Sequence, residues 1–153
     1  EAQLDRFMFN IPLDYPSYDE EIEVVKGTTS VQDYALQHVL TGAQIKNFQQ
    51  LIRKVPIADN VLEYAVSLAT KTRPNTGRAT QKVNDYISWG AGPRASQYLV
   101  LGAKCHAAIH GKYSPDIEDV QAIAKYVLRH RIVRNYKAEA EGISEENIIE
   151  TLF

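Results

Sequence analysis

The chain has 153 residues, of which 44% are hydrophobic, so it is long enough for one ordinary domain with its own core. Its 17 basic and 19 acidic residues give a net charge of -2, which excludes a global positive field for nucleic acid or anionic membranes. Cys105 is the only cysteine, and no apolar stretch approaches the roughly 20 residues of a membrane-spanning helix. This excludes an internal disulfide and a cysteine-based zinc site, and it predicts a cytoplasmic protein with no membrane partner.

The first predicted element is a short strand over residues 6–13, which carry aromatic and branched side chains and precede a turn at Asp14-Tyr15-Pro16. Even a two-stranded hairpin is marginal in water, so we expect this strand to pair with strands outside the sequence. The sequence opens at Glu1 and not at a Met, and we therefore expect it to be a piece of a longer protein.

The remaining elements are predicted to be helices. Ser17 and Glu20 have the spacing of a capping box, Pro93 suits the first position of a helix, and Gly111 suits a C-cap. With apolar residues at helical spacing, these signals predict helices over 18–26, 43–54, 57–72, 93–110, 115–130 and 144–153. The polar stretch 73–91 is predicted to be a loop. The sequence thus predicts a mainly α fold, an antiparallel helical bundle with a short N-terminal strand remnant.

The hexapeptide Gly-Ala-Gly-Pro-Arg-Ala at 90–95 is the strongest candidate site. Arg94 falls in the first turn of the helix predicted from Pro93, where free backbone N–H groups and the helix dipole already make the surroundings positive. A cation is unfavourable there unless an anion binds, and backbone donors beside a guanidinium form a phosphate-binding arrangement. Alternatively, Arg94 reaches solvent or a neighbouring carboxylate, and local physics favours neither interpretation.

The hexapeptide resembles the sensor 2 signature of MoxR-family AAA+ proteins, usually Gly-Ala-Ser-Pro-Arg-Ala, whose arginine reaches from a helical lid to the terminal phosphates of the nucleotide. Gly92 stands where the family has a capping serine, a change that costs about a few tenths of a kcal/mol and leaves the arginine in place. Residues 1–7, Glu-Ala-Gln-Leu-Asp-Arg-Phe, are similar to the family's Pro-Glu-Ala-Gln-Leu-Asp-Arg-Phe segment at the end of the AAA+ core. The two motifs occur in the family's order, and the resemblance spans nearly the whole chain.

The resemblance implies a division of the chain and a set of partners. Residues 1–14 would be the end of the AAA+ core, and residues 15–153 would be the helical lid. The missing AAA+ core would be the first partner of the lid. Other copies would complete a homo-oligomeric ring, commonly a hexamer, that works as a chaperone-like motor on proteins such as those with von Willebrand factor A domains.

The resemblance also implies catalytic roles for two arginines. Arg94, with Pro93 and Gly92 beside it, would meet the phosphates of ATP bound in its own subunit. Arg6 would be the finger offered to the ATP of the neighbouring subunit. ATP and magnesium are therefore the expected cofactors of the longer protein. The chain contains no Gly-x-x-x-x-Gly-Lys-[Ser/Thr] phosphate loop and no strand ending in paired acids, so we expect neither cofactor to bind the chain alone, which should be inactive as an ATPase.

Two histidines and a basic cluster are weaker candidates. His106 and His110 have a metal-ligand spacing, but no third ligand is indicated, so packing of His106 and compensation of the helix dipole by His110 are favoured. The basic cluster consists of Arg129, His130, Arg131, Arg134 and Lys137. It either contacts nucleic acid or a neighbouring subunit, or it forms a solvated helix end, and the net charge favours the solvated helix end.

Two aromatic residues and the cysteine are the last candidates. Tyr86 and Trp89 precede the hexapeptide and either stack near adenine or plug the bundle, and plugging is favoured. Cys105 lies on the inward face of its predicted helix, so a core residue is favoured over a nucleophile.

Two other functions stay open on the sequence. Magnesium chelatase subunits and helicase loaders have similar lids. If the chain came from one of these families, the longer protein would insert a metal or remodel nucleic acid. The other class of function is a stand-alone helical interaction or nucleic-acid-binding module, in which the basic cluster would bind the partner and Arg94 would have no role.

Overall fold

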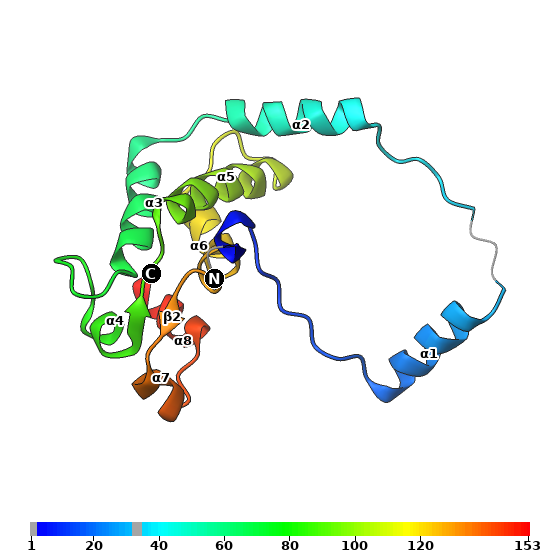
Figure 1. Cartoon of the computed structure of the whole chain (residues 1–153). Helices are drawn as coiled ribbons and strands as arrows, with labels where there is room; N and C mark the ends of the chain where they lie inside the picture. Colours follow the sequence, from blue (N-terminus) through cyan, green and yellow to red (C-terminus); the bar gives the residue numbers. More distant parts are fainter. Residues whose placement is uncertain (1–2, 32–34) are drawn as a thin grey trace.

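The computed structural model describes residues 3–31 and 35–153, and it is mainly helical, as predicted (Figure 1). In chain order the elements are η1 (Leu4–Arg6), α1 (Tyr18–Thr29), α2 (Gly42–Lys54), α3 (Asp59–Lys71), α4 (Gln81–Tyr86), β1 (Ile87–Trp89), α5 (Pro93–Ile109), α6 (Ile117–Leu128), β2 (Val133–Arg134), α7 (Tyr136–Ala140), α8 (Glu145–Ile149) and η2 (Glu150–Leu152). Within the described residues, every helix is too short or too polar to cross a membrane.

The centre of the fold is the packing of α5 against α3 and α6. Small residues on the inner face of α5, among them Ala95, Gly102 and Ala103, are fully buried and allow a neighbouring helix to approach. A Cβ atom on Gly102 would lie 3.2 Å from Cδ1 of Ile123 on α6, so the two helices are already in close contact. The largest buried side chains around them are Leu68, Leu99, Val120, Val127 and Leu128.

Short elements form a second group at one end of this bundle (Figure 1). There α4 contacts α7 and α8, and α8 contacts α6. β1 and β2 pair antiparallel, with Ile87 opposite Arg134 and Trp89 opposite Val133. The predicted loop over 73–91 is therefore wrong for residues 81–89. These elements are too short to show a periodic pattern, and partners far along the sequence stabilise them.

The predicted strand over residues 6–13 is also wrong. Leu4–Arg6 form a 3-10 turn, and residues 7–17 run on without pairing to any strand in the described part of the chain. One main-chain hydrogen bond, from Asn10 N to Tyr126 O at 2.9 Å, joins this stretch to α6. Aromatic and branched residues form a strand only where a sheet edge accepts their ladder hydrogen bonds, and these residues have no such edge. The division at residue 14 stays a prediction.

The helices α1 and α2 lie in the long segment that connects η1 to α3, and α1 is separated from the bundle (Figure 1). Neither helix has a buried residue. Ser17 and Glu20 form the predicted capping box, with 2.8 Å between Ser17 N and Glu20 Oε2. The predicted end of this helix at residue 26 is wrong, because α1 continues to Thr29. Hydroxyl groups of residues 28–30 donate to main-chain carbonyls one turn earlier and so close the last turn.

Asp119 is a fully buried carboxylate at the start of α6. It accepts hydrogen bonds from Asp116 N at 2.9 Å and from Lys112 Nζ at 3.1 Å, and its Oδ1 lies 2.6 Å from His106 Nδ1. Burial alone would raise the pKa of Asp119. The hydrogen bonds from Asp116, His106 and Lys112 outweigh burial and lower the pKa from 3.8 to about 2. The ionised form of Asp119 therefore stabilises the folded state.

Replacement of this carboxylate should destabilise the bundle. At pH 7 we expect Asp119→Asn to lower the free energy of unfolding by about 2 kcal/mol, because a lowered pKa is a preference of the folded state for the ionised form. As pH falls from about 4 toward 2, the unfolded wild-type chain binds this proton first, so the stabilisation is lost in that window. Urea unfolding of both proteins across this pH range measures the effect. An identical pH dependence in the variant would contradict the assignment.

Gly90 allows the turn before α5 to pass against the end of α3. A Cβ atom on Gly90 would lie 2.4 Å from Thr72 O and 2.6 Å from Arg73 Cα. Ala91 N donates to Thr72 Oγ1 at 2.9 Å, and Arg73 Nε donates to Ala91 O at 2.9 Å. These contacts fix where α5 begins. Gly92, the N-cap of α5, has an extended backbone and no neighbouring atom within 4 Å of a built Cβ atom.

The two glycines of the hexapeptide should therefore respond differently to substitution. Gly90→Ala should lower the free energy of unfolding by about 1–3 kcal/mol, because the added methyl group meets main-chain atoms. Gly92→Ser is the matched control and should stabilise the chain by about a few tenths of a kcal/mol through a new N-cap hydrogen bond. Thermal melting followed by circular dichroism compares both with wild type. A Gly90→Ala protein with the same melting temperature as wild type would show that the turn does not need this close approach.

Candidate functional site

Arg94 lies in the first turn of α5, as predicted, directly after Pro93 at the first helical position. Its Nη1 atom donates to Asp5 Oδ2 at 2.6 Å, and the two side chains are 43% and 36% exposed. The sequence left open whether Arg94 reaches a neighbouring carboxylate, and in the structure Asp5 is that carboxylate. Asp5 offsets the unfavourable position of a cation at a helix N-terminus. Apart from this contact, the guanidinium has no hydrogen-bond partner in the described residues, and its other donors remain accessible.

Asp5 is shared with a second arginine, Arg131. Its Oδ1 atom accepts from Arg131 Nε at 2.9 Å. The Arg131 side chain is only 1% exposed and donates to four main-chain carbonyls besides, those of Asp5 at 2.8 Å, Phe7 at 2.6 Å, Met8 at 3.3 Å and Val127. Burial lowers the pKa of the guanidinium, and the hydrogen bond and charge of Asp5 act against this shift. Arg131 thus binds residues 5–8 to the end of α6.

Two further side chains contact the same short segment. Tyr98 Oη on α5 donates to Arg6 O at 3.0 Å, and the Tyr98 ring lies 5.0 Å from the Arg131 guanidinium. His130 Nε2 lies 3.1 Å from Phe7 O. Burial lowers the pKa of His130, which favours the neutral imidazole beside this carbonyl. Three side chains from two regions of the helical bundle therefore contact the main chain of residues 5–8.

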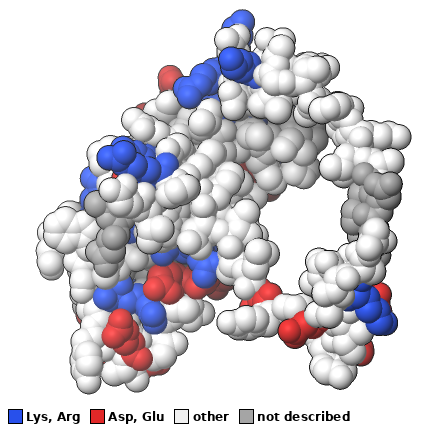
Figure 2. Space-filling model, turned by 45° about the vertical axis from the view of Figure 1, so that its right-hand side comes forward, with Lys and Arg blue, Asp and Glu red and all other residues white. Residues whose placement is uncertain are grey.

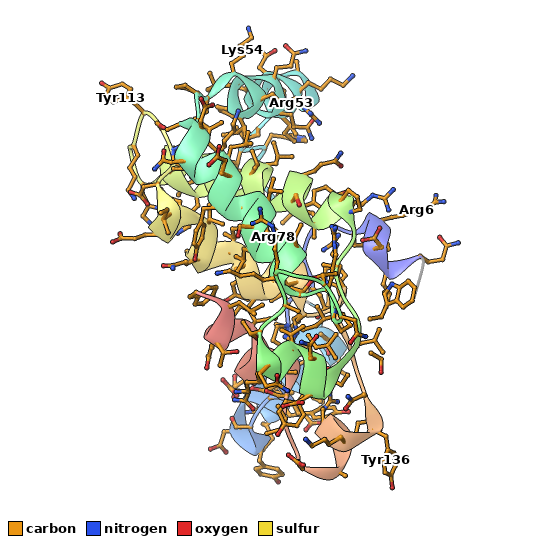
Figure 3. The ribbon with its side chains drawn as sticks, turned by 90° about the vertical axis from the view of Figure 1, so that its left-hand side faces the viewer. Arg6, Arg53, Lys54, Arg78, Tyr113 and Tyr136 are labelled. Atoms are coloured by element: carbon orange, nitrogen blue, oxygen red, sulfur yellow. The ribbon has the colours of Figure 1, made fainter. Side chains whose placement is uncertain are left out.

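Arg6 extends from this anchored segment. Its side chain is exposed, and it projects from the edge of the bundle in Figure 3. Among the described residues the guanidinium has no partner, although the carbonyl of Arg6 is bound by Tyr98. Glu1 and Ala2 of the N-terminal motif lie outside the described residues. Because Asp5 contacts Arg94, the structure places the Arg6 segment beside the hexapeptide.

The basic cluster is not a continuous cationic surface. Arg129 pairs with Glu146 at 2.8 Å, and Arg134 pairs with Glu145 at 2.8 Å. Arg131 is buried against Asp5, and Lys137 lies over the Tyr86 ring. On the face shown in Figure 2, Lys and Arg atoms lie in separate groups, several of them beside Asp and Glu atoms. The interpretation as a solvated helix end is wrong for Arg131, and acidic neighbours offset the charges of Arg129 and Arg134.

The aromatic pair before the hexapeptide has two different environments. Trp89 is 73% exposed and does not plug the bundle, so that prediction is wrong for this residue. Its side chain borders a surface hollow of about 460 Å³ next to Gly90 and Pro93. Tyr86 packs against the core and donates a hydrogen bond to Glu141 at 2.7 Å.

The remaining candidates have local roles. His106 is half-buried against Asp119 and so does more than pack. His110 is the C-cap of α5, where its Nδ1 lies 2.8 Å from His106 O. Cys105 is partly exposed, so the prediction of a core residue is wrong. No cluster of three or more His, Cys, Asp or Glu side chains in residues 3–31 and 35–153 is arranged to hold a metal ion.

Comparisons with known proteins agree with this architecture. Residues 79–152 match the AAA lid domain family. The chain is 32% identical over 151 residues to Chaperone MoxR1 of Mycobacterium tuberculosis and 30% identical over 154 residues to the protein YeaC of Bacillus subtilis. Each alignment covers 97% of this chain, but only 39% of MoxR1 and 44% of YeaC. The chain therefore spans less than half the length of these relatives.

A solved structure extends the similarity to the whole arrangement. The crystal structure of a Cytophaga hutchinsonii protein assigned as an ATPase superposes with a TM-score of 0.86 and 34% identity, over 99% of this chain and 46% of that chain. The lid match includes the hexapeptide, and the other similarities include the N-terminal segment held by Arg131. Residues 79–152 carry an AAA lid domain, and together these similarities support a lid fragment like those of MoxR-type AAA+ proteins.

Proposed function

We propose that the chain acts as the lid of an ATP-hydrolysing AAA+ protein and that Arg94 binds the terminal phosphates of the nucleotide. The observation that carries this proposal is the position of Arg94 in the first turn of α5, half-exposed and paired, within the described residues, only with the half-exposed Asp5. A guanidinium beside free helix N–H groups is suited to bind a phosphate in a bidentate manner. Gly92 and Pro93 leave the approach to the first turn open, since neither carries a side chain that covers it.

Arg6 and Arg94 would serve the same phosphate site. Asp5, the residue before Arg6, lies 2.6 Å from Arg94, so both arginines belong to one small region of the surface. The family resemblance implies that Arg6 contacts the ATP bound by a neighbouring subunit. If Arg6 reaches across the subunit boundary, Arg94 faces the same ATP, in place of the ATP in its own subunit. We therefore propose that both arginines act across the boundary.

The cofactors and partners of the proposed activity follow from the resemblance. ATP and magnesium would be bound by an AAA+ core outside the chain, because the phosphate loop and the magnesium-binding acids are not among its residues. Action across a boundary requires a ring of copies, and a hexamer is the family's common form. A chaperone-like motor acting on von Willebrand factor A domain proteins remains our proposal for the longer protein. The magnesium chelatase and helicase-loader alternatives would use the same arginines.

Removal of Arg94 should lower turnover more than affinity. In the protein that contains this chain, we expect Arg94→Ala to reduce kcat for ATP by about 10–10³-fold, because the arginine meets phosphate charge mainly as the transition state develops. Arg94→Lys should restore little, since an ammonium lacks the bidentate fork. Stability should change by at most about 1 kcal/mol, the usual value of an exposed ion pair. Steady-state ATPase kinetics and thermal melting measure both. A stable, assembled Arg94→Ala protein with wild-type kcat would remove the role.

Mixed rings should reveal which subunit Arg94 serves. One variant carries Arg94→Ala with an intact phosphate loop, and the other carries Arg94 with a phosphate loop that cannot bind ATP. If Arg94 acts across the boundary, mixing these two inactive proteins restores ATP turnover, because the second supplies the arginine to the ATP held by the first. If Arg94 acts within its own subunit, the mixture stays inactive. The same mixture made with Arg6→Ala is the matched control and should also regain activity.

A further inference from the structure

We propose that Arg131 is a positioning residue that fixes both Arg6 and Arg94 for the phosphate site, through the main chain of residues 5–8 and the carboxylate of Asp5. This inference rests on the proposed function for its effect on catalysis. The anchoring of the segment itself does not depend on that function. Arg131 touches neither substrate nor cofactor in this assignment and acts only through its neighbours.

The geometry of Arg131 is that of a clamp. Its guanidinium donates to one carboxylate oxygen and to three carbonyls of one short segment, with distances between 2.6 and 3.3 Å, and to the carbonyl of Val127 on α6. The fork of an arginine is rigid and planar, so several simultaneous acceptors fix the segment in both position and orientation. Because the side chain is 1% exposed, water does not compete for these donors.

Little else holds the segment in place. Leu4 and Phe7 are exposed, and residues 7–17 pair with no strand in the described residues, so neither apolar burial nor a sheet fixes this stretch. Met8 supplies one apolar contact, since its Cε atom lies 3.4 Å from a Cβ atom built on Gly102. The hydrogen bonds from Tyr98 and His130 reach single carbonyls, and Asn10 N adds one main-chain bond to Tyr126 O. Arg131 is thus the contact that joins several points of the segment at once.

The shared carboxylate extends the effect of the clamp to Arg94. Asp5 uses Oδ1 for Arg131 and Oδ2 for Arg94, so the position of one guanidinium determines the position of the carboxylate that receives the other. Asp5 also directly precedes Arg6. A change at Arg131 therefore alters the placement of two arginines that are far apart in the sequence, although it contacts the side chain of neither.

Amide hydrogen exchange of the protein that contains this chain tests the anchoring directly. In Arg131→Ala we expect the amides of Arg6, Phe7 and Asn10 to exchange about tenfold faster or more, because the bond from Asn10 N to Tyr126 O opens when the segment detaches and the local turn bonds of Arg6 N and Phe7 N lose their anchored frame. Arg134→Ala is the matched control, since Arg134 lies in the same region, pairs with Glu145 and contacts none of residues 5–8. Faster exchange in both variants, or in neither, would overturn the clamp.

Kinetic coupling tests the consequence for catalysis. We expect Arg131→Ala to lower kcat by about 10–100-fold with a small change in KM, because a misplacement of about 1 Å costs rate more than binding. In an Arg6→Ala background the same substitution should have a smaller effect, since the arginine it positions is gone. Equal effects in both backgrounds would overturn positioning. Wild-type turnover in Arg6→Ala and Arg94→Ala would instead remove the proposed function, and the exchange experiment would still decide the clamp.

A second variant covers the case in which Arg131→Ala does not fold. Asp5→Ala removes the carboxylate partner from the half-exposed segment and substitutes no residue of α5 or α6. We expect the same faster exchange at Arg6 and Phe7, with wild-type exchange in α5 and α6. Slow exchange at Arg6 and Phe7 in a folded Asp5→Ala protein would show that the shared carboxylate does not hold the segment.

Discussion

The buried guanidinium of Arg131 needs a carboxylate and several hydrogen-bond acceptors, and the N-terminal segment supplies most of them. A charge removed from water is costly unless it is paired and its donors are bonded, because the interior cannot replace its hydration. Among the described residues, the helical bundle offers Arg131 only one carbonyl, that of Val127. The remaining acceptors come from a segment that includes Asp5, 126 positions earlier in the sequence. The segment is held by the lid, and the lid in turn needs the segment, so two distant parts of the chain become one structural unit.

Helix α5 joins this unit to the core of the lid. Its first turn carries Arg94, its second carries Tyr98 against the carbonyl of Arg6, and its small residues lie against α6. A single rigid helix therefore connects the candidate phosphate-binding arginine, the docked segment and the packed centre. The close approach at Gly90 adds a fourth constraint, because it fixes where α5 starts relative to α3. A shift of the lid core would move these features together.

The features predicted correctly from the sequence are those that local chemistry determines. Pro93 and Gly111 mark α5 almost to the residue, and the capping box at Ser17 marks the start of α1, because both signals act within one helical turn. The errors involve distant partners. A strand at residues 6–13 needs an edge that the described part of the chain does not provide, and β1 exists because β2 pairs with it. Arg131 was grouped with its basic neighbours, since nothing near it in sequence reveals a carboxylate at Asp5.

Asp5 forms one exposed pair with Arg94 and one buried pair with Arg131, and the exposed pair is the weaker of the two. The pair with Arg94 is about 40% exposed, and such pairs contribute roughly 0–1 kcal/mol. A phosphate at the fork of Arg94 would gain charge-assisted hydrogen bonds like those of the carboxylate, and in addition the free N–H groups and the dipole of the helix N-terminus. Under the proposed function, exchange of Asp5 for a phosphate at Arg94 would therefore cost little. The pair with Arg131 is buried on one side and keeps its backbone acceptors, so Asp5 would stay in place if Arg94 exchanged it for a phosphate.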